Sequence, residues 1–346
     1  MSSRRQEGMG LVELLVWMAI SLLIISVIGV VYANTKQLAR VNDTVSRLQE
    51  NGRFVIHLLN RDLRMAGFRG CDITGSGSHV NVLNSTAYPY RFDIALGGFY
   101  GSGGGWSPTR DPSISTLSPP PLVNTDIVTI RHIDGPGVAL TAAMGTTTAD
   151  LQVAAGSPLA NGDVLLVADC SYSAIFNATA FNSATGVIAH ELGAGVPGNS
   201  TKNLSDPLDP HKFSTDASVY RLVTRTYYIG ASARKPGTNS LWANSIPAYD
   251  LQAQPEEMVE GVDGLVLLYG EDTDGDKAAN RYVTANAVGT WNNVVSVRPQ
   301  VLLATVRDKM ATSPQPYTFN GVTKTPTDLR LRSVLASVVT VRNRVP

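Results

Sequence analysis

The chain has 346 residues, of which 43% are hydrophobic and 16% are charged, and its 28 basic residues balance 28 acidic ones. A net charge of zero gives no electrostatic footprint for nucleic acid, so we expect no nucleic-acid partner. The length is sufficient for a membrane segment followed by one large or two small domains, each with a hydrophobic core.

The first informative element is the apolar run 9–33, which follows a short head containing Arg4 and Arg5. A helix of this length spans about 37 Å and crosses the hydrocarbon core of a bilayer. Positive charges before a membrane span tend to stay in the cytoplasm, which leaves the remainder of the chain outside it. The sequence therefore predicts a single-pass membrane protein with a large extracytoplasmic part.

An acid, Glu13, interrupts this run five residues after Gly8. A charge inside a membrane helix costs roughly 2.5–3.5 kcal/mol on insertion scales, so it needs a partner or access to the headgroups. A secretory signal cleaved after Ala33 is one interpretation, but the run is longer than the usual apolar core and contains the acid. A twin-arginine signal is another, although the residues after Arg4 and Arg5 are polar.

The spacing of Gly8 and Glu13 resembles the leader of the type IV pilin and pseudopilin superfamily. The resemblance implies that residues 1–8 are a prepilin leader, which a prepilin peptidase removes after Gly8 before it N-methylates Met9. It also implies that Glu13 meets the terminal amine of a neighbouring subunit and sets the subunit register. A paired buried charge is tolerated where an unpaired one is not. The alternative is an acid that simply reaches the headgroups.

Beyond residue 33 the helical period continues while one face becomes polar. We predict one helix over 9–66, with a transmembrane part at 9–33 and an amphipathic part at 34–66 that ends near Gly67 and Gly70. Its apolar stripe consists of Leu38, Val41, Val45, Leu48, Val55, Leu59 and Leu63, with Gly52 in the same stripe.

Two stretches near the end of this helix resemble one particular family within the type IV pilin and pseudopilin superfamily. Residues 48–54 read LQENGRF and residues 61–71 read RDLRMAGFRGC, and both resemble the PilW family of minor pilins. The resemblance continues at 259–262, 268–276 and 340–344. It implies a non-enzymatic subunit of the inner membrane that joins other minor pilins and the major pilin, primes pilus assembly and remains at or near the pilus tip.

Cys71 and Cys170 are the only cysteines. Because the bulk of the chain is expected in an oxidising compartment, we predict that they form one disulfide. Such a bond would close a loop of about a hundred residues and stabilise the fold by up to roughly 4–5 kcal/mol. Two unrelated buried thiols are the alternative.

Residues 67–346 are rich in Gly, Ser, Thr, Asn and Pro, and their hydrophobic runs are too short for helices. We predict an antiparallel β-rich globular domain and thus a pilin-like α+β fold. Pro299 indicates an edge strand or a bulge, and the glycine-rich segment 97–105 indicates an exposed loop. The expected strands are 126–133, 163–169, 187–190, 219–229, 262–269, 294–306 and 329–341.

The segment after residue 270 contains a candidate metal site. Asp272, Asp274 and Asp276 alternate around Gly275, as the oxygen ligands of calcium loops do, and Asn280 is a possible fourth ligand. The spacing departs from that of an EF-hand, and a polar hairpin turn is the alternative. We expect no other cofactor.

Two other functions stay open. An anchored enzyme is disfavoured, because His190 has Ala194 where a zinc protease would place its second histidine. A binding module or adhesin displayed at the tip is suggested by the Gly- and Pro-rich stretch 97–121 with its aromatic residues. Within the pilin superfamily, a pseudopilin of type II secretion is the other candidate.

Overall fold

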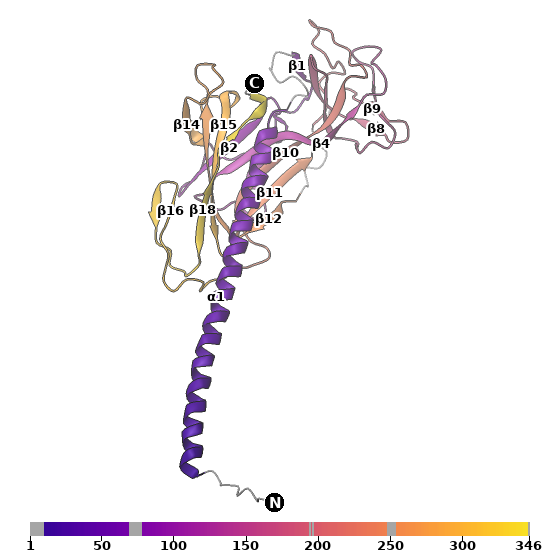
Figure 1. Cartoon of the computed structure of the whole chain (residues 1–346). Helices are drawn as coiled ribbons and strands as arrows, with labels where there is room; N and C mark the ends of the chain where they lie inside the picture. Colours follow the sequence, from indigo (N-terminus) through magenta and orange to yellow (C-terminus); the bar gives the residue numbers. More distant parts are fainter. Residues whose placement is uncertain (1–9, 69–77, 194, 196, 248–253, 345–346) are drawn as a thin grey trace, which may run out of the picture. The chain divides into compact units, whose positions relative to one another are not determined.

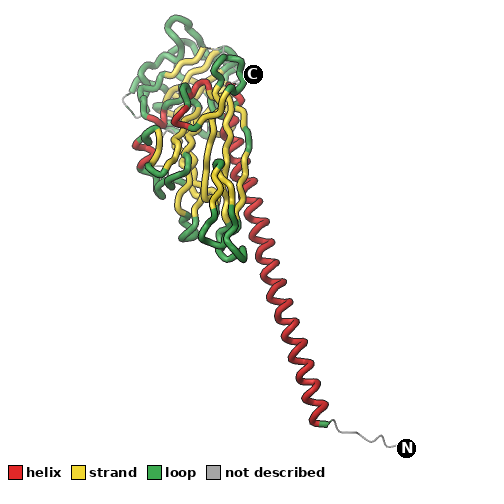
Figure 2. Tube along the Cα trace, turned by 90° about the vertical axis from the view of Figure 1, so that its left-hand side faces the viewer, coloured by secondary structure: helices red, strands yellow, loops and turns green. Residues whose placement is uncertain are grey.

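The computed structural model describes residues 10–68, 78–193, 195, 197–247 and 254–344. It contains two compact units, residues 1–49 and residues 50–346, and each is described by itself. Figure 1 shows one long helix followed by a chain that is mostly strand and loop, and Figure 2 marks the same division by colour. The predicted α+β class is confirmed.

Helix α1 (Leu11–Met65) is continuous over 55 residues. No proline lies within it, so nothing removes a backbone donor from its hydrogen-bond ladder. Glu13 lies in the first turn, where its negative charge interacts favourably with the partial positive charge of the helix N-terminus. The helix ends just before Gly67, which adopts a φ of +69°. The predicted end lies near Gly67 and Gly70, and the observed helix ends at Met65; Met9 and Gly70 lie outside the described residues.

In the first unit, helix residues 11–40 are exposed on every face. Leu11 is 77% exposed, Trp17 60% and Val31 59%. Among the described residues, α1 is the one helix that is long and apolar enough to cross a membrane, with a mean hydropathy of 2.8 over its most apolar window. A helix that is apolar all round requires apolar surroundings, which fits a single-pass membrane anchor.

The second unit contains a nine-stranded sheet organised around the long strand β10 (Ser218–Ala231). One side of β10 pairs with β4, and the other side pairs first with β6 and then with β11, so the sheet branches there. Among the described strands of this sheet, only β1 and β7 pair in parallel. The other strands of this sheet are β1 (Ser78–Asn81), β2 (Leu96–Ser102), β3 (Gly105–Ser107), β4 (Ile127–Ala139), β6 (Val164–Ala168), β7 (Tyr172–Asn177), β11 (Asn239–Pro247) and β12 (Glu256–Glu260).

A second sheet has five antiparallel strands in the order β14, β13, β15 and β18, with β19 also paired to β15. Its strands are β13 (Val262–Glu271), β14 (Arg281–Val283), β15 (Val294–Ala304), β18 (Arg332–Ala336) and β19 (Val339–Thr340). The smaller elements are strands β5 (Leu151–Gln152), β8 (Ala180–Asn182), β9 (Val187–Ala189), β16 (Tyr317–Phe319) and β17 (Val322–Lys324), and helices α2 (Pro112–Ser115), η1 (Tyr88–Tyr90), η2 (Ala285–Ala287), η3 (Trp291–Asn293) and η4 (Arg342–Arg344).

Each predicted strand region contains a strand, although the region 329–341 holds two, β18 and β19. The exposed loop predicted at 97–105 is wrong, because residues 96–102 form β2 and its first four residues are buried. The reason is tertiary packing. A Cβ on Gly97 would lie 2.6 Å from the Tyr88 hydroxyl oxygen, and one on Gly98 would lie 2.4 Å from that of Tyr269. These glycines make room for two phenol rings.

The prediction of an edge strand or a bulge at Pro299 is also wrong. Strand β15 is interior, and its pairing with β13 runs in regular register through Leu267 and Pro299. On its other side β15 pairs with β18 up to Ala336 and with β19 from Val339. Pro299 lies opposite the break between these strands, and its carbonyl accepts from Ser337 N at 3.1 Å. The missing N–H therefore interrupts no ladder.

The end of α1 that belongs to the second unit buries its part of the predicted apolar stripe, whereas Leu38 at the start of the stripe is 61% exposed. Val55, Leu59 and Leu63 are each fully buried, with 0% exposure. Burial of each such side chain contributes about 1.5–3 kcal/mol. Gly52 lies in the same stripe, where a Cβ would come within 2.3 Å of Leu335 Cδ1. A larger residue at this position would collide with β18.

Asp126, just before β4, joins the two sheets. Its backbone N–H donates to Leu265 O at 2.8 Å, and its carboxylate accepts from Leu267 N at 2.8 Å and from Gly101 N at 2.9 Å. The side chain is 1% exposed, and burial raises the pKa of Asp126 to about 6. One buried carboxyl group thus links β13 to β2.

Candidate functional site

The predicted processing and register residues lie at the start of α1. Glu13 is exposed, and its backbone N–H donates to Gly10 O at 3.0 Å in the first turn of the helix. Gly8 and Met9, the predicted cleavage and methylation positions, lie outside the described residues. Their processing and the pairing of Glu13 with a neighbouring subunit remain predictions.

A second feature is the attachment of α1 to the globular part through Asp62. This side chain is 2% exposed, and its Oδ2 accepts from Tyr227 Oη at 2.6 Å and from Arg225 Nη1 at 3.0 Å. Both partners are on β10, two positions apart and therefore on the same face of the sheet. Arg61 Nε donates to Oδ1 at 2.9 Å, and His132 of β4 lies 3.8 Å away.

The electrostatics of this cluster favour the ionised acid. Burial by itself would raise the pKa of Asp62, but the hydrogen bond from Tyr227 and the nearby His132 and Arg225 outweigh it, so the pKa lies below its ordinary value. Burial lowers the pKa of His132, which leaves its ring neutral near pH 7. Tyr227 and Arg225 therefore supply the stabilisation at that pH, and Asp62 acts as a buried charged anchor.

Polar contacts along the helix continue this attachment. Asn51 Nδ2 donates to Glu260 O at 3.2 Å, Asn60 Oδ1 accepts from Ser337 Oγ at 2.9 Å, and Asn343 Nδ2 donates to Ala66 O at 3.0 Å. The stretches LQENGRF and RDLRMAG thus include Asn51, Asp62 and Ala66, and Asn60 directly precedes the second stretch. The sequence analysis missed the role of Asp62, although an acid three residues after Leu59, beside the apolar stripe, was a signal of a buried partner.

The acidic loop connects β13 to β14. Asp272, Asp274 and Asp276 each bring one carboxylate oxygen to within 4.8 Å of the others. Asp272 is 7% exposed and accepts backbone N–H groups of Asp274, Gly275 and Lys277 at 3.2, 2.6 and 3.0 Å. The structure therefore brings the three predicted carboxylates together, as a hard cation requires.

The fourth candidate ligand, Asn280, closes the same loop. Its Oδ1 accepts from Thr273 N at 2.6 Å, and its Nδ2 donates to Asp274 Oδ2 at 3.0 Å. These internal hydrogen bonds also suit the polar hairpin turn considered above. Calcium binding by this loop stays a prediction.

The predicted disulfide cannot be followed in full. Cys170 lies two residues after β6, whereas Cys71 lies outside the described residues. The pairing of Cys71 with Cys170 remains a prediction.

These features define a class of protein: a chain whose long helix fits a single-pass membrane anchor in its first part and is attached by buried polar contacts to a β-rich domain in its last part. Residues 226–343 match the family model PilW, described as Type IV Pilus-assembly protein W. Comparisons with curated proteins and with solved structures gave no match. The family match supports involvement in type IV pilus assembly. It contains the stretches 259–262 and 268–276, whose resemblance the sequence analysis noted.

Proposed function

We propose that this protein is a minor pilin of the type IV pilus, anchored in the inner membrane by residues 9–33. In this role it joins other minor pilins and the major pilin in a complex at or near the tip, and that complex primes assembly. The observation that carries the proposal is the PilW match of residues 226–343 in a chain that begins with α1.

The matched segment supports the proposal for a further reason. It supplies much of the surface that holds the helix, including Tyr227, Glu260, Leu335, Ser337 and Asn343. The segment that matches the family model, residues 226–343, is therefore also a segment that contacts the long N-terminal helix. A pilus subunit needs such an attachment, because the helix packs in the filament while the domain is carried on its outside.

In this proposal the apolar part of α1 performs the assembly step. The prepilin peptidase cleaves after Gly8 and methylates Met9, and the helix then moves laterally from lipid into the growing filament. Glu13 receives the terminal amine of a neighbour, since a charge in apolar surroundings is tolerated when it is paired. The role requires no catalytic residue, and we propose that the protein is not an enzyme.

The test replaces Glu13 by Gln and, separately, by Leu in the full-length gene. We expect normal cleavage and methylation of both variants but reduced recovery in sheared pili and fewer pili. Asp43→Asn is the matched control, because Asp43 is an exposed acid of the same helix whose partner, Arg47, lies one turn away. Piliation equal to that of the control would overturn the role of Glu13. A mature chain that starts beyond Tyr32 would overturn the pilin proposal.

The second candidate, a binding module displayed at the tip, is favoured by one observation, a cavity in the globular domain.

A further inference from the structure

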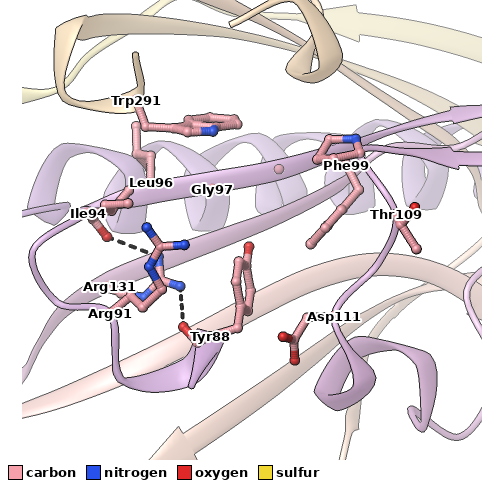
Figure 3. Close-up of a pocket in the computed structure, with 12 residues that line it drawn as sticks. Tyr88, Arg91, Ile94, Leu96, Gly97, Phe99, Thr109, Asp111, Arg131 and Trp291 are labelled. Atoms are coloured by element: carbon pink, nitrogen blue, oxygen red, sulfur yellow. Dashed lines mark hydrogen bonds between the residues drawn. The ribbon is translucent and has the colours of Figure 1, made fainter. Parts of the chain in front are cut away.

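The cavity has a volume of about 250 Å³ and lies beside strands β2 and β4. Its lining comes from the turn at η1, from β2 and β4, from the segment before α2 and from η3, so it gathers distant parts of the chain (Figure 3). The side chains that line the cavity take no part in the helix attachment or the acidic loop, although the backbone carbonyl of Arg131 accepts from Gly67 N at 3.0 Å just after α1. The cavity is therefore separate from the features that support the pilus role.

A buried cation, Arg131 of β4, lines one end. It is 3% exposed, its Nη1 donates to Ile94 O at 3.0 Å, and its Nη2 donates to the carbonyl of Tyr88. Its Nε has no hydrogen-bond partner among the residues that the structure describes. Within the described part of the chain no carboxylate forms an ion pair with it, and burial lowers the pKa of Arg131. The guanidinium stacks on the Tyr88 ring at 4.7 Å, and Asp93 lies near enough to raise its pKa against the larger effect of burial. Neither contact is an ion pair, so a bound anion would supply a direct counter-charge.

The charges around the cavity are asymmetric. Arg91 is exposed and lies beside Arg131 at the same end (Figure 3), which adds a second positive charge. Asp111 lies on the other side of Tyr88 in that view. Its Oδ1 accepts from Ser113 N and Oγ at 2.9 and 2.7 Å as the cap of α2, and no hydrogen bond of the described residues uses its Oδ2. The cavity thus presents donors at one end and an acceptor at the other.

Aromatic rings form the walls between these ends. Tyr88 and Phe99 pack with ring centroids 5.5 Å apart. Trp291 lines the cavity on the side away from Tyr88. The Tyr88 hydroxyl is buried beside the side chains of Thr129 and Arg131, which lower its pKa against the larger effect of burial. It fits there only because residue 97 is glycine, since a Cβ would lie 2.6 Å from it. This hydroxyl is a further group that a ligand can engage.

We propose that this cavity binds a small carboxylic acid carried on a hydroxylated ring, the chemical class of the uronic acids. The ligand carboxylate pairs with Arg131 and Arg91, because the guanidinium fork matches a carboxylate. The ring lies against Tyr88 and Trp291, and a ring hydroxyl donates to Asp111. The volume is about eight times the ~30 Å³ that a water molecule occupies, which suits one sugar ring. The inference goes beyond the proposed pilus role and does not depend on it.

The charges around the cavity favour a uronic acid over a neutral sugar and over a phosphate dianion. A neutral sugar would leave Arg131 without a counter-charge. A phosphate dianion would bring two negative charges into a cavity that already contains Asp111, and like charges in a poorly solvated site repel strongly. A carboxylate with hydroxyl donors satisfies both ends.

The experiment measures binding of D-galacturonate to the full-length chain in detergent by isothermal titration calorimetry and saturation-transfer NMR. D-galactose is the neutral probe and inorganic phosphate the alternative anion. We expect saturable binding of galacturonate that is at least about tenfold tighter than binding of either other probe.

Variants tie the signal to the cavity. Arg91→Gln should weaken galacturonate binding several-fold without affecting the fold, because Arg91 is exposed. Gly97→Ala should abolish binding by displacing the Tyr88 ring. Arg110→Gln is the matched control, since Arg110 stacks on Trp106 and is outside the cavity lining, and it should bind normally. Absence of saturable galacturonate binding, equal affinity for galactose or phosphate, or an Arg91→Gln variant that matches the control would each overturn the proposal.

Discussion

Replacement of Asp62 by Asn tests the attachment of α1 to the globular domain most directly. The substitution keeps the shape of the side chain but removes its charge and turns one acceptor into a donor, which faces either Arg225 and Tyr227 or Arg61. Arg225 is then left 20% exposed beside a neutral group. Breaking a buried ion pair in this way typically costs about 3–5 kcal/mol.

The hydrogen bonds support that range. The bond from Tyr227 to the charged acceptor is worth about 1.5–3 kcal/mol, and the bond from Arg225 has a similar value. The Arg61 contact adds little, because the Arg61 side chain is 56% exposed and exposed pairs contribute about 0–1 kcal/mol. We therefore expect Asp62→Asn to lower the free energy of unfolding by about 3–5 kcal/mol and Tyr227→Phe to lower it by about half as much.

The assay is urea unfolding of the full-length chain in detergent, read by pulse proteolysis of the globular part. Asp43→Asn is the control for loss of an exposed helix acid and should change stability by less than about 1 kcal/mol. The double variant Asp62→Asn/Tyr227→Phe should be less destabilised than the sum of the single variants, because the two residues share one interaction. An Asp62→Asn chain as stable as the control would refute the anchor.

Other predictions concern pH, metal and redox state. Burial raises the pKa of Asp126 from 3.8 to about 6, so the folded state holds a proton that the unfolded state releases. Stability should therefore fall by up to about 3 kcal/mol as pH rises from 4 to 6, and Asp126→Asn should remove that slope in urea titrations; an unchanged slope would exclude Asp126 as its source. Calcium should raise the melting temperature of the wild type but not of Asp274→Asn. Asp216→Asn is the exposed control. If the wild type has the same melting temperature in calcium and in EDTA, the loop is a hairpin turn without a calcium site. Cys71 and Cys170 should resist alkylation until reduced, and reduction should destabilise the chain by up to roughly 4–5 kcal/mol; rapid labelling without reductant would contradict the disulfide.

The sequence predicted the elements whose signals are local. The single helix follows from a sustained helical period without proline, and Gly67 supplied its end. The strands follow from short runs of β-branched residues. The prediction of an exposed loop at 97–105 is wrong because Gly97 and Gly98 leave space for the phenols of Tyr88 and Tyr269. No local pattern reveals which distant ring will occupy that space.

The same division applies to the sites. Asp272, Asp274 and Asp276 are close in the chain, so their spacing alone predicted that they would meet. Arg131 gave no such signal, because a single arginine in a strand is ordinarily at the surface and its burial depends on elements that follow and precede it by many residues. Sequence patterns could not predict contacts between residues that are far apart in the sequence.

The buried polar contacts of α1 explain more than its stability. An apolar stripe by itself could shift along the sheet by one helical turn, about 5.4 Å, with little change in buried area. Asp62 prevents that shift, since moving it away from Tyr227 and Arg225 would leave a carboxylate and a guanidinium unpaired. Gly52 adds a steric constraint, because only glycine fits against Leu335 at that level. Charge pairing and shape therefore fix the same register of residues 50–65 on the sheet.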